Sequence, residues 1–213
     1  MAPVHVRMAA GQTVIESDAA TDARAAAEFA ERRVLELPDL FAPDARALLA
    51  RTLADSRFVP DDMQIGGSRL RESPPRIAPL MCWLLGQPAL RRWIETITAT
   101  APLAAVGGAT ARFEAGGGQH LDWHNDLKPD RKRMLAVTVN LGTLPYEGGR
   151  FEMKRRDADA PFFQHAHLQP YGALIFAIDK TLLHRVTPVT AGGPRTVFGG
   201  WFLSETPRPG MPI

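Results

Sequence analysis

The chain has 213 residues, of which 45 % are hydrophobic, and its formal net charge at pH 7 is +2. This length supports one well-buried globular domain, and the near balance of charge argues against a strongly basic nucleic-acid-binding protein. The single cysteine, Cys82, leaves neither an intrachain disulfide nor a cysteine metal cluster available, and this usage is typical of a reducing compartment.

The distribution of charged and apolar residues predicts a cytoplasmic protein without a membrane partner. Glu16 and Asp18 interrupt the N-terminal segment, which therefore lacks the apolar stretch of an export signal. The longest apolar run, residues 173–178, is far shorter than the roughly 20 residues that cross a bilayer. Two basic triplets, at 131–133 and 154–156, are interpreted as solvated strand ends rather than as a nucleic-acid surface.

Four helices are predicted in the first half, because alanine-rich and leucine-rich segments recur at helical spacing between proline and glycine breaks. We expect Thr21 or Asp22 to cap the first helix, which runs to about Glu36 and ends at Pro38. The other three are expected over residues 43–53, 77–85 and 88–97. Residues 59–79, rich in arginine, proline and glycine, are either a lid over a site or an ordered connector.

From about residue 109 the pattern changes to short β-branched and aromatic runs separated by glycine, proline and asparagine, which is typical of an all-β unit. Strands are expected near residues 109–114, 119–126, 133–141, 149–155, 162–168, 172–178, 182–188 and 195–203. Strands of this number and length favour a two-sheet jelly roll. We therefore predict one domain over residues 1–213, mainly β, in which a mostly helical part (about 1–105) packs on one face of a jelly-roll core (about 106–205).

His124 and Asp126 are candidate metal ligands, because residues two apart on a strand share a face. With His184, from another predicted strand, they would make the two-histidine, one-carboxylate set that leaves open positions on iron(II). His120 and Asp122 repeat the same spacing on the same predicted strand and, by parity, on the same face. The period alone therefore does not decide which pair binds a metal.

Five segments in order carry a resemblance to a known family: GQHLDWHND at 118–126, MLAVTVNLG at 134–142, EGGRF at 147–151, PYGALIF at 170–176 and HRVTPVTAGGPR at 184–195. With the later Trp201, they make residues 113–202 resemble the prolyl 4-hydroxylase-like branch of the 2-oxoglutarate and iron(II) dependent dioxygenases. The resemblance implies a double-stranded β-helix core with His124, Asp126 and His184 as metal ligands. It leaves His120 outside the metal shell.

Arg195 is the expected anchor of 2-oxoglutarate. A planar guanidinium can hold both oxygens of the far carboxylate, and a turn at residues 192–194 would bring Arg195 back beside the strand of His184. Two tyrosines common in the family are replaced here by Phe113 and Asn140. Asn140 remains a candidate 2-oxoglutarate ligand, because its amide can donate a hydrogen bond.

The other candidate pocket residues are His120, Trp123 and Trp201, each of which has a plain structural alternative as a polar strand residue or a core aromatic. The resemblance implies hydroxylation of a C–H bond in a peptide (prolyl-like) or small amino-acid-like substrate, with release of succinate and CO2. Ascorbate is a candidate reductant. Asp126 favours hydroxylation, since halogenating relatives lose this carboxylate. The alternatives are a cupin-type oxygenase or isomerase that does not use 2-oxoglutarate, and a non-catalytic jelly-roll binding module.

Overall fold

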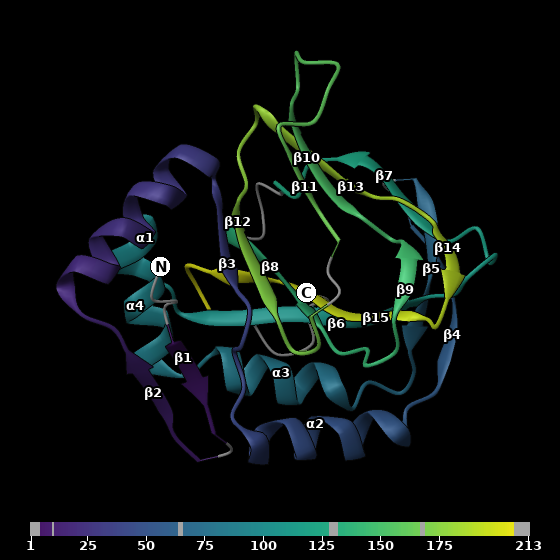
Figure 1. Ribbon diagram of the computed structural model, residues 1–213, viewed down its shortest axis with the longest axis horizontal. Helices are drawn as coiled ribbons and strands as arrows, with labels where there is room; N and C mark the ends of the chain where they lie inside the picture. The colour runs from purple at the N-terminus through teal and green to yellow at the C-terminus, as the bar shows by residue number, and fades with distance from the viewer. Residues whose placement is uncertain (1–4, 10, 64–65, 128–131, 167–168, 207–213) are drawn as a thin grey trace.

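The computed structural model describes residues 5–9, 11–63, 66–127, 132–166 and 169–206 (Figure 1). The helices are α1 (Ala19–Arg32), α2 (Pro43–Ala54), α3 (Ile77–Leu85) and α4 (Pro88–Thr98). The strands are β1 (His5–Met8), β2 (Thr13–Glu16), β3 (Val34–Leu37), β4 (Phe58–Asp62), β5 (Gly67–Glu72), β6 (Ala105–Phe113), β7 (His120–His124), β8 (Arg133–Asn140), β9 (Tyr146–Gly148), β10 (Phe151–Arg155), β11 (Phe163–His165), β12 (Ala173–Ala177), β13 (Leu182–Val186), β14 (Val189–Gly192) and β15 (Arg195–Leu203).

Most of the strands belong to one curled antiparallel sheet, which Figure 1 shows wrapping into a half-barrel. Its order is β11–β10–β13–β7–β5–β6–β15–β8–β12–β3, with β4 paired to β5. β1 with β2 and β14 with β9 form two separate two-stranded sheets. This is the predicted double-stranded β-helix, in which side chains on the inner face alternate with side chains on the outer face.

β5 is the strand that joins the two sides of the curled sheet. It pairs with β7 through Gly67 opposite Leu121 and with β6 through Arg71 opposite Ala111. Gly67 has φ +87°, and a Cβ there would lie 2.2 Å from the backbone oxygen of His120. Only glycine therefore lets β5 approach β7 this closely.

The helices pack on one outer side of the sheet, as predicted, with α2 and α3 below β6 and β15 in Figure 1. α3 contacts β6 and β15 directly, while α2 contacts α3, and α1 contacts both α4 and β3. A hydrogen bond from Trp93 Nε1 to Asp22 Oδ1 (2.9 Å) also links α4 to α1. Of the helices that the structure describes, none combines the length and the apolar character needed to cross a membrane.

The first helix differs from its prediction at both ends. Its N-cap is Asp18, whose Oδ1 accepts a hydrogen bond from the backbone N–H of Thr21 (2.7 Å), so neither Thr21 nor Asp22 is the cap. It ends at Arg32, because Arg33 adopts the left-handed conformation (φ 59°). Residues 34–37, expected as helix, form β3 beside β12, since their apolar side chains are buried on the sheet instead.

The eight predicted strands are present, but the part before residue 105 contains more sheet than expected. Residues 59–79, expected as either a lid or an ordered connector, form regular elements where the structure describes them. They contain most of the β4–β5 hairpin and the start of α3. β9 and β14, which were not predicted, form a two-stranded antiparallel sheet from segments far apart in sequence.

Candidate active site

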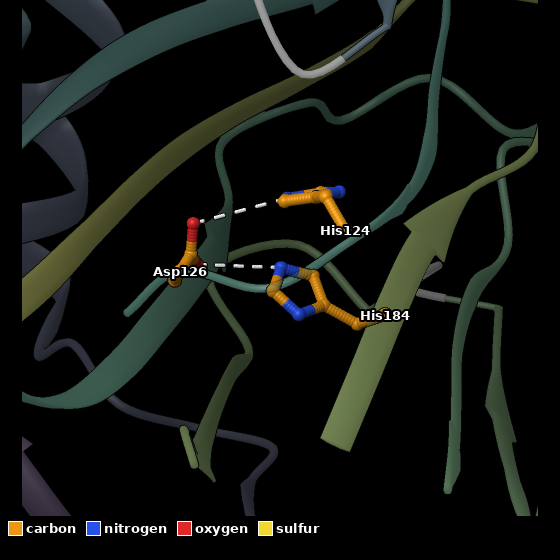
Figure 2. A group of neighbouring side chains, drawn as sticks. All are labelled: His124, Asp126 and His184. Atoms are coloured by element: carbon orange, nitrogen blue, oxygen red, sulfur yellow. Dashed lines mark ion pairs between the residues drawn. The ribbon is translucent and has the colours of Figure 1, made fainter. Parts of the chain in front are cut away.

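The three predicted metal ligands come together beside the paired strands β7 and β13 (Figure 2). β7 and β13 pair with His124 directly opposite His184, and the centroids of the two rings lie 4.1 Å apart. An Asp126 carboxylate oxygen lies 3.3 Å from His184 Nε2, and the other lies 3.8 Å from His124 Nε2. One ligand atom from each residue lies within 4.8 Å of the other two, which is the arrangement that a single divalent cation requires.

The electrostatics of this group favour the protonation states that bind a metal. Burial, together with a smaller effect of the charge of His184, lowers the pKa of His124 to about 4. Burial alone would raise the pKa of Asp126, but its interactions with His184, His124 and Trp201 outweigh burial and hold the pKa well below its usual range. The His124 Nδ1–H donates to the Asp122 backbone oxygen (2.6 Å). Nε2 therefore carries the lone pair that can bind a metal.

Two side chains that sequence analysis missed hold the Asp126 segment in place. Asn125 Nδ2 donates to the backbone oxygens of Leu182 (2.9 Å) and Asp179, at the start of β13. Arg133 Nη1 donates to the Asp126 backbone oxygen (3.0 Å). Arg133 belongs to the basic triplet that we interpreted as solvated, yet its side chain is only 5 % exposed. That interpretation is wrong for Arg133, since a charge pattern carries no signal of this contact.

The second histidine–aspartate pair lies outside the group. His120 Nδ1–H donates to the Gly118 backbone oxygen (2.8 Å), and its Nε2 lies 3.4 Å from a carboxylate oxygen of Asp122, whose side chain is 61 % exposed. The parity argument fails because the pairing of β7 with β13 is irregular between His124 and Leu121. This irregularity turns Leu121 and His124 to the cavity together, and His120 away from it.

The ligand group opens on a cavity of about 110 Å³ inside the half-barrel. Its walls are mainly apolar and include Phe113, Leu121, Phe151, Phe176, Val186 and Val197. Phe151 and Phe176 also flank the His184 ring, with centroid distances of 5.8 and 5.0 Å. A cavity of this kind excludes bulk water from the metal group.

Arg195 lies at the cavity wall and is 1 % exposed. Its guanidinium carbon lies 5.2 Å from the centroid of the Phe113 ring, and its side chain is hydrogen-bonded to the hydroxyl of Tyr146. A Cβ at Gly149 would lie 2.9 Å from Arg195 Cδ, so a glycine there makes room for the arginine. Arg195 does not return beside β13 as expected, because β15 pairs with β6 and β8 on the other side of the sheet.

Tyr146 is a site residue that sequence analysis missed. Arginine only donates hydrogen bonds, so the Tyr146 oxygen accepts from Arg195. Burial raises the pKa of Tyr146, which keeps that hydroxyl protonated. In the sequence, Tyr146 stands just before the glycine pair 148–149. This position predicts a turn and gives no indication of a binding residue.

The predicted pocket residues Trp201 and Trp123 and the predicted 2-oxoglutarate ligand Asn140 differ in where they lie. Trp201 lines the cavity, on the same face of β15 as Arg195. Trp123 does not, and its ring instead lies beside Arg185 (4.6 Å) and Lys154 (5.1 Å). Asn140 is not brought to the cavity either.

The Asn140 amide is used by the backbone around it. Its Nδ2 donates to the Gln169 backbone oxygen (3.2 Å), and its Oδ1 accepts from the Gly142 N–H (3.1 Å). The residue therefore closes the turn after β8, and the structure gives no support to its predicted role in binding 2-oxoglutarate.

The residues present fit both iron(II) and an anionic co-substrate. The ligand set is two imidazoles and one carboxylate, which suits a non-haem iron(II) oxygenase. Among the residues that the structure describes, no carboxylate pairs with Arg195, and its Nε has no hydrogen-bond partner. A fully buried guanidinium is costly without an anion, so the cavity is suited to a ligand that carries a carboxylate.

The comparisons with known proteins agree with this geometry. Residues 109–203 match the model of the 2OG-Fe(II) oxygenase superfamily. A prolyl-4-hydroxylase from Pseudomonas putida superposes with a TM-score of 0.60 at 20 % identity, over 87 % of this chain and 100 % of that one. None of the curated proteins matches the sequence.

Two further solved structures share the fold. An oxidoreductase of the 2OG-Fe(II) oxygenase family from Burkholderia pseudomallei gives a TM-score of 0.63 at 16 % identity, over 97 % of both chains. A prolyl hydroxylase from Trichoplax adhaerens, in complex with a hypoxia inducible factor peptide fragment, gives 0.55 at 11 % identity, over 85 % of this chain and 88 % of that one. Residues 109–203 are therefore similar to the 2OG-Fe(II) oxygenase superfamily, and the chain shares its fold with solved oxygenases of that family.

Proposed function

We propose that this oxygenase hydroxylates a C–H bond of a peptide (prolyl-like) or small amino-acid-like substrate. His124, Asp126 and His184 are the Fe(II) ligands. Arg195, assisted by Tyr146, binds the 5-carboxylate of 2-oxoglutarate. One observation carries the assignment: the three-ligand group and a buried guanidinium without a carboxylate partner among the described residues face the same cavity.

Fe(II) and 2-oxoglutarate, when bound, supply the activation of O2, so that substrate C–H, 2-oxoglutarate and O2 become substrate C–OH, succinate and CO2. The chain supplies geometry. Arg195 and the Tyr146 hydroxyl fix one end of the keto acid, which orients its other end toward the metal ligands. The apolar walls keep water out, and Phe151 and Phe176 hold the His184 ring in place.

The substrate class rests on the relatives and on the cavity. Two of the similar structures are a prolyl-4-hydroxylase and a prolyl hydroxylase with a bound peptide, although at 20 % and 11 % identity they are guides to the fold. The small apolar cavity accommodates a ring or short aliphatic group beside the metal ligands. A proline-like or small aliphatic target meets both conditions.

The test is an anaerobic titration of the metal-free protein, first with Fe(II) and then with 2-oxoglutarate, followed by visible absorption. We expect a new band with the wild type, succinate formation once O2 and ascorbate are added, and 2-oxoglutarate binding weakened about tenfold or more in Arg195→Gln. Arg112→Gln is the matched control, because Arg112 is the neighbour of Phe113 on β6 but does not line the cavity.

Two results would contradict the proposal. If 2-oxoglutarate changes neither the spectrum nor the succinate yield, a cupin-type enzyme or a binding module is the better reading. If Arg112→Gln and Arg195→Gln weaken the binding of 2-oxoglutarate equally, Arg195 is not the anchor of its 5-carboxylate.

A further inference from the structure

A second arginine, Arg69 on β5, also lines the cavity. In the sheet, β6 separates β5 from β15, the strand of Arg195. Arg71 pairs with Ala111 of β6, and directly opposite side chains of an antiparallel pair share a face. Arg69 lies two residues before Arg71 and therefore on this inner face as well. Arg69, Ala111 and Leu121 accordingly line the cavity together.

The two arginines differ in depth. Arg195 is 1 % exposed and bonded to Tyr146, whereas the Arg69 side chain is 19 % exposed. Arg69 shares its part of the wall with Met63, which follows β4, so it stands on the β4–β5 hairpin at the open side. The cavity thus has one guanidinium in its interior and one at its entrance.

Among the residues that the structure describes, two guanidinium groups of β5 pair with a single carboxylate. Asp61 of β4 accepts a hydrogen bond from Arg69 Nε (2.8 Å) and also lies 3.8 Å from Arg71 Nε. One carboxylate therefore serves two guanidinium groups. Among the described residues, Asp61 is the one carboxylate that pairs with Arg69, and its hydrogen bond is to Nε.

We infer that Arg69 binds the carboxylate of the primary substrate, and that the substrate is a small carboxylic acid, free amino acids included. This inference rests on the proposed function, in which Arg195 is taken by 2-oxoglutarate. The remaining walls are almost entirely apolar, so Arg69 is the group that can recognise a charge on the second ligand. With its carboxylate at the entrance, the acid presents its apolar end to the metal ligands.

Binding to protein loaded with Mn(II) and saturating 2-oxoglutarate tests this inference, because saturation blocks the Arg195 site and Mn(II) avoids turnover. The probes are the common L-amino acids and short monocarboxylic acids, each compared with its carboxamide by ligand-observed NMR and calorimetry. At least one acid binds and its amide does not. Arg69→Gln raises the Kd of that acid about tenfold or more and leaves the Kd of 2-oxoglutarate within about twofold of the wild-type value.

Asp61→Asn separates recognition from a structural role of the Asp61–Arg69 ion pair. It removes the ion pair but keeps the guanidinium, so acid binding is retained or tightened. Arg71→Gln, which alters the more exposed arginine on the same carboxylate, also leaves acid binding unchanged.

Several outcomes overturn the inference: no acid binds, amides bind as well as acids, Arg69→Gln binds like the wild type, or Asp61→Asn loses binding as Arg69→Gln does. A failure of the proposed function gives a different result. If the proposed function is wrong, 2-oxoglutarate itself does not bind to the Mn(II) protein, and the loading titration reveals this before any acid is added.

Discussion

The guanidinium of Arg133 lies on the face of the Trp201 ring, with its central carbon 3.4 Å from the ring centroid. The same side chain donates to the backbone of Asp126 and lies 3.8 Å from one of its carboxylate oxygens. Trp201 of β15 and Arg133 of β8 thus hold Asp126, a proposed metal ligand that follows β7. Outer contacts of this kind fix the direction of a ligand and tune its affinity for the metal.

Replacing Arg133 should therefore weaken metal binding without removing a metal ligand. We expect Arg133→Gln to lower the affinity for Fe(II) or Mn(II) by about 10-fold to 100-fold, measured by competition with a chelator. Lys132→Gln is the matched control, because the Lys132 side chain is 56 % exposed and pairs with Glu205. Equal losses in the two variants would show that net charge, and not the Arg133 contact, is responsible.

The two histidine–aspartate pairs allow a direct test of the ligand set. His124→Ala should lower metal affinity by more than the roughly 100-fold that outer contacts can cost, because a donor atom is lost. His120→Ala should leave metal affinity unchanged, since His120 bonds to Gly118 and lies outside the group. A metal titration that ranks the two variants the other way would refute the assignment.

The hydroxyl of Tyr146 should matter for 2-oxoglutarate and not for the metal. Tyr146→Phe removes a hydrogen bond to a charged carboxylate, so we expect the Kd of 2-oxoglutarate to rise about tenfold at constant metal affinity. Tyr171→Phe is the control, because the second of the chain's two tyrosines packs edge-on against Phe41 and does not line the cavity. If Tyr146→Phe binds 2-oxoglutarate normally, the hydroxyl serves only to orient Arg195.

Cys82 should be an unreactive thiol. Burial raises its pKa to about 11 from the ordinary 9.0, so at pH 8 the thiolate is about 100-fold scarcer in the folded protein than in the unfolded chain. Alkylation by iodoacetamide should be slower by a similar factor without urea, and should accelerate as the pH rises toward 11. The neutral thiol is favoured by folding, so its contribution to stability is complete below pH 9 and is lost above it. Equal alkylation rates in native and urea-treated protein at pH 8 would contradict this.

The regular elements were predictable because their patterns are local. α3 is apolar throughout, and β8 carries a nearly continuous apolar and β-branched run. β3 was not predictable, since the helix before it stops at Arg33, where an arginine and not a glycine adopts positive φ. β9 and β14 are short, and each is a strand only because the other lies beside it.

The candidate site divides in the same way. The triad and Arg195 could be named from spacing and from family resemblance, and the structure brings these four side chains to one cavity. The contact between Arg195 and Tyr146 arises only when β9 and β14 pair. The position of His120 depends on an irregularity in strand pairing, which a period of two residues does not reveal.

The place of β5 in the sheet has a consequence for any attempt to shorten this protein to a smaller fragment. Residues 109–203, which match the superfamily, contain β7 and most of β6 but not the strand that is hydrogen-bonded to both. A fragment cut to those limits would have an open seam, with backbone donors and acceptors exposed on either side of it. A design that transfers the proposed metal site to another protein scaffold therefore has to include the β4–β5 hairpin.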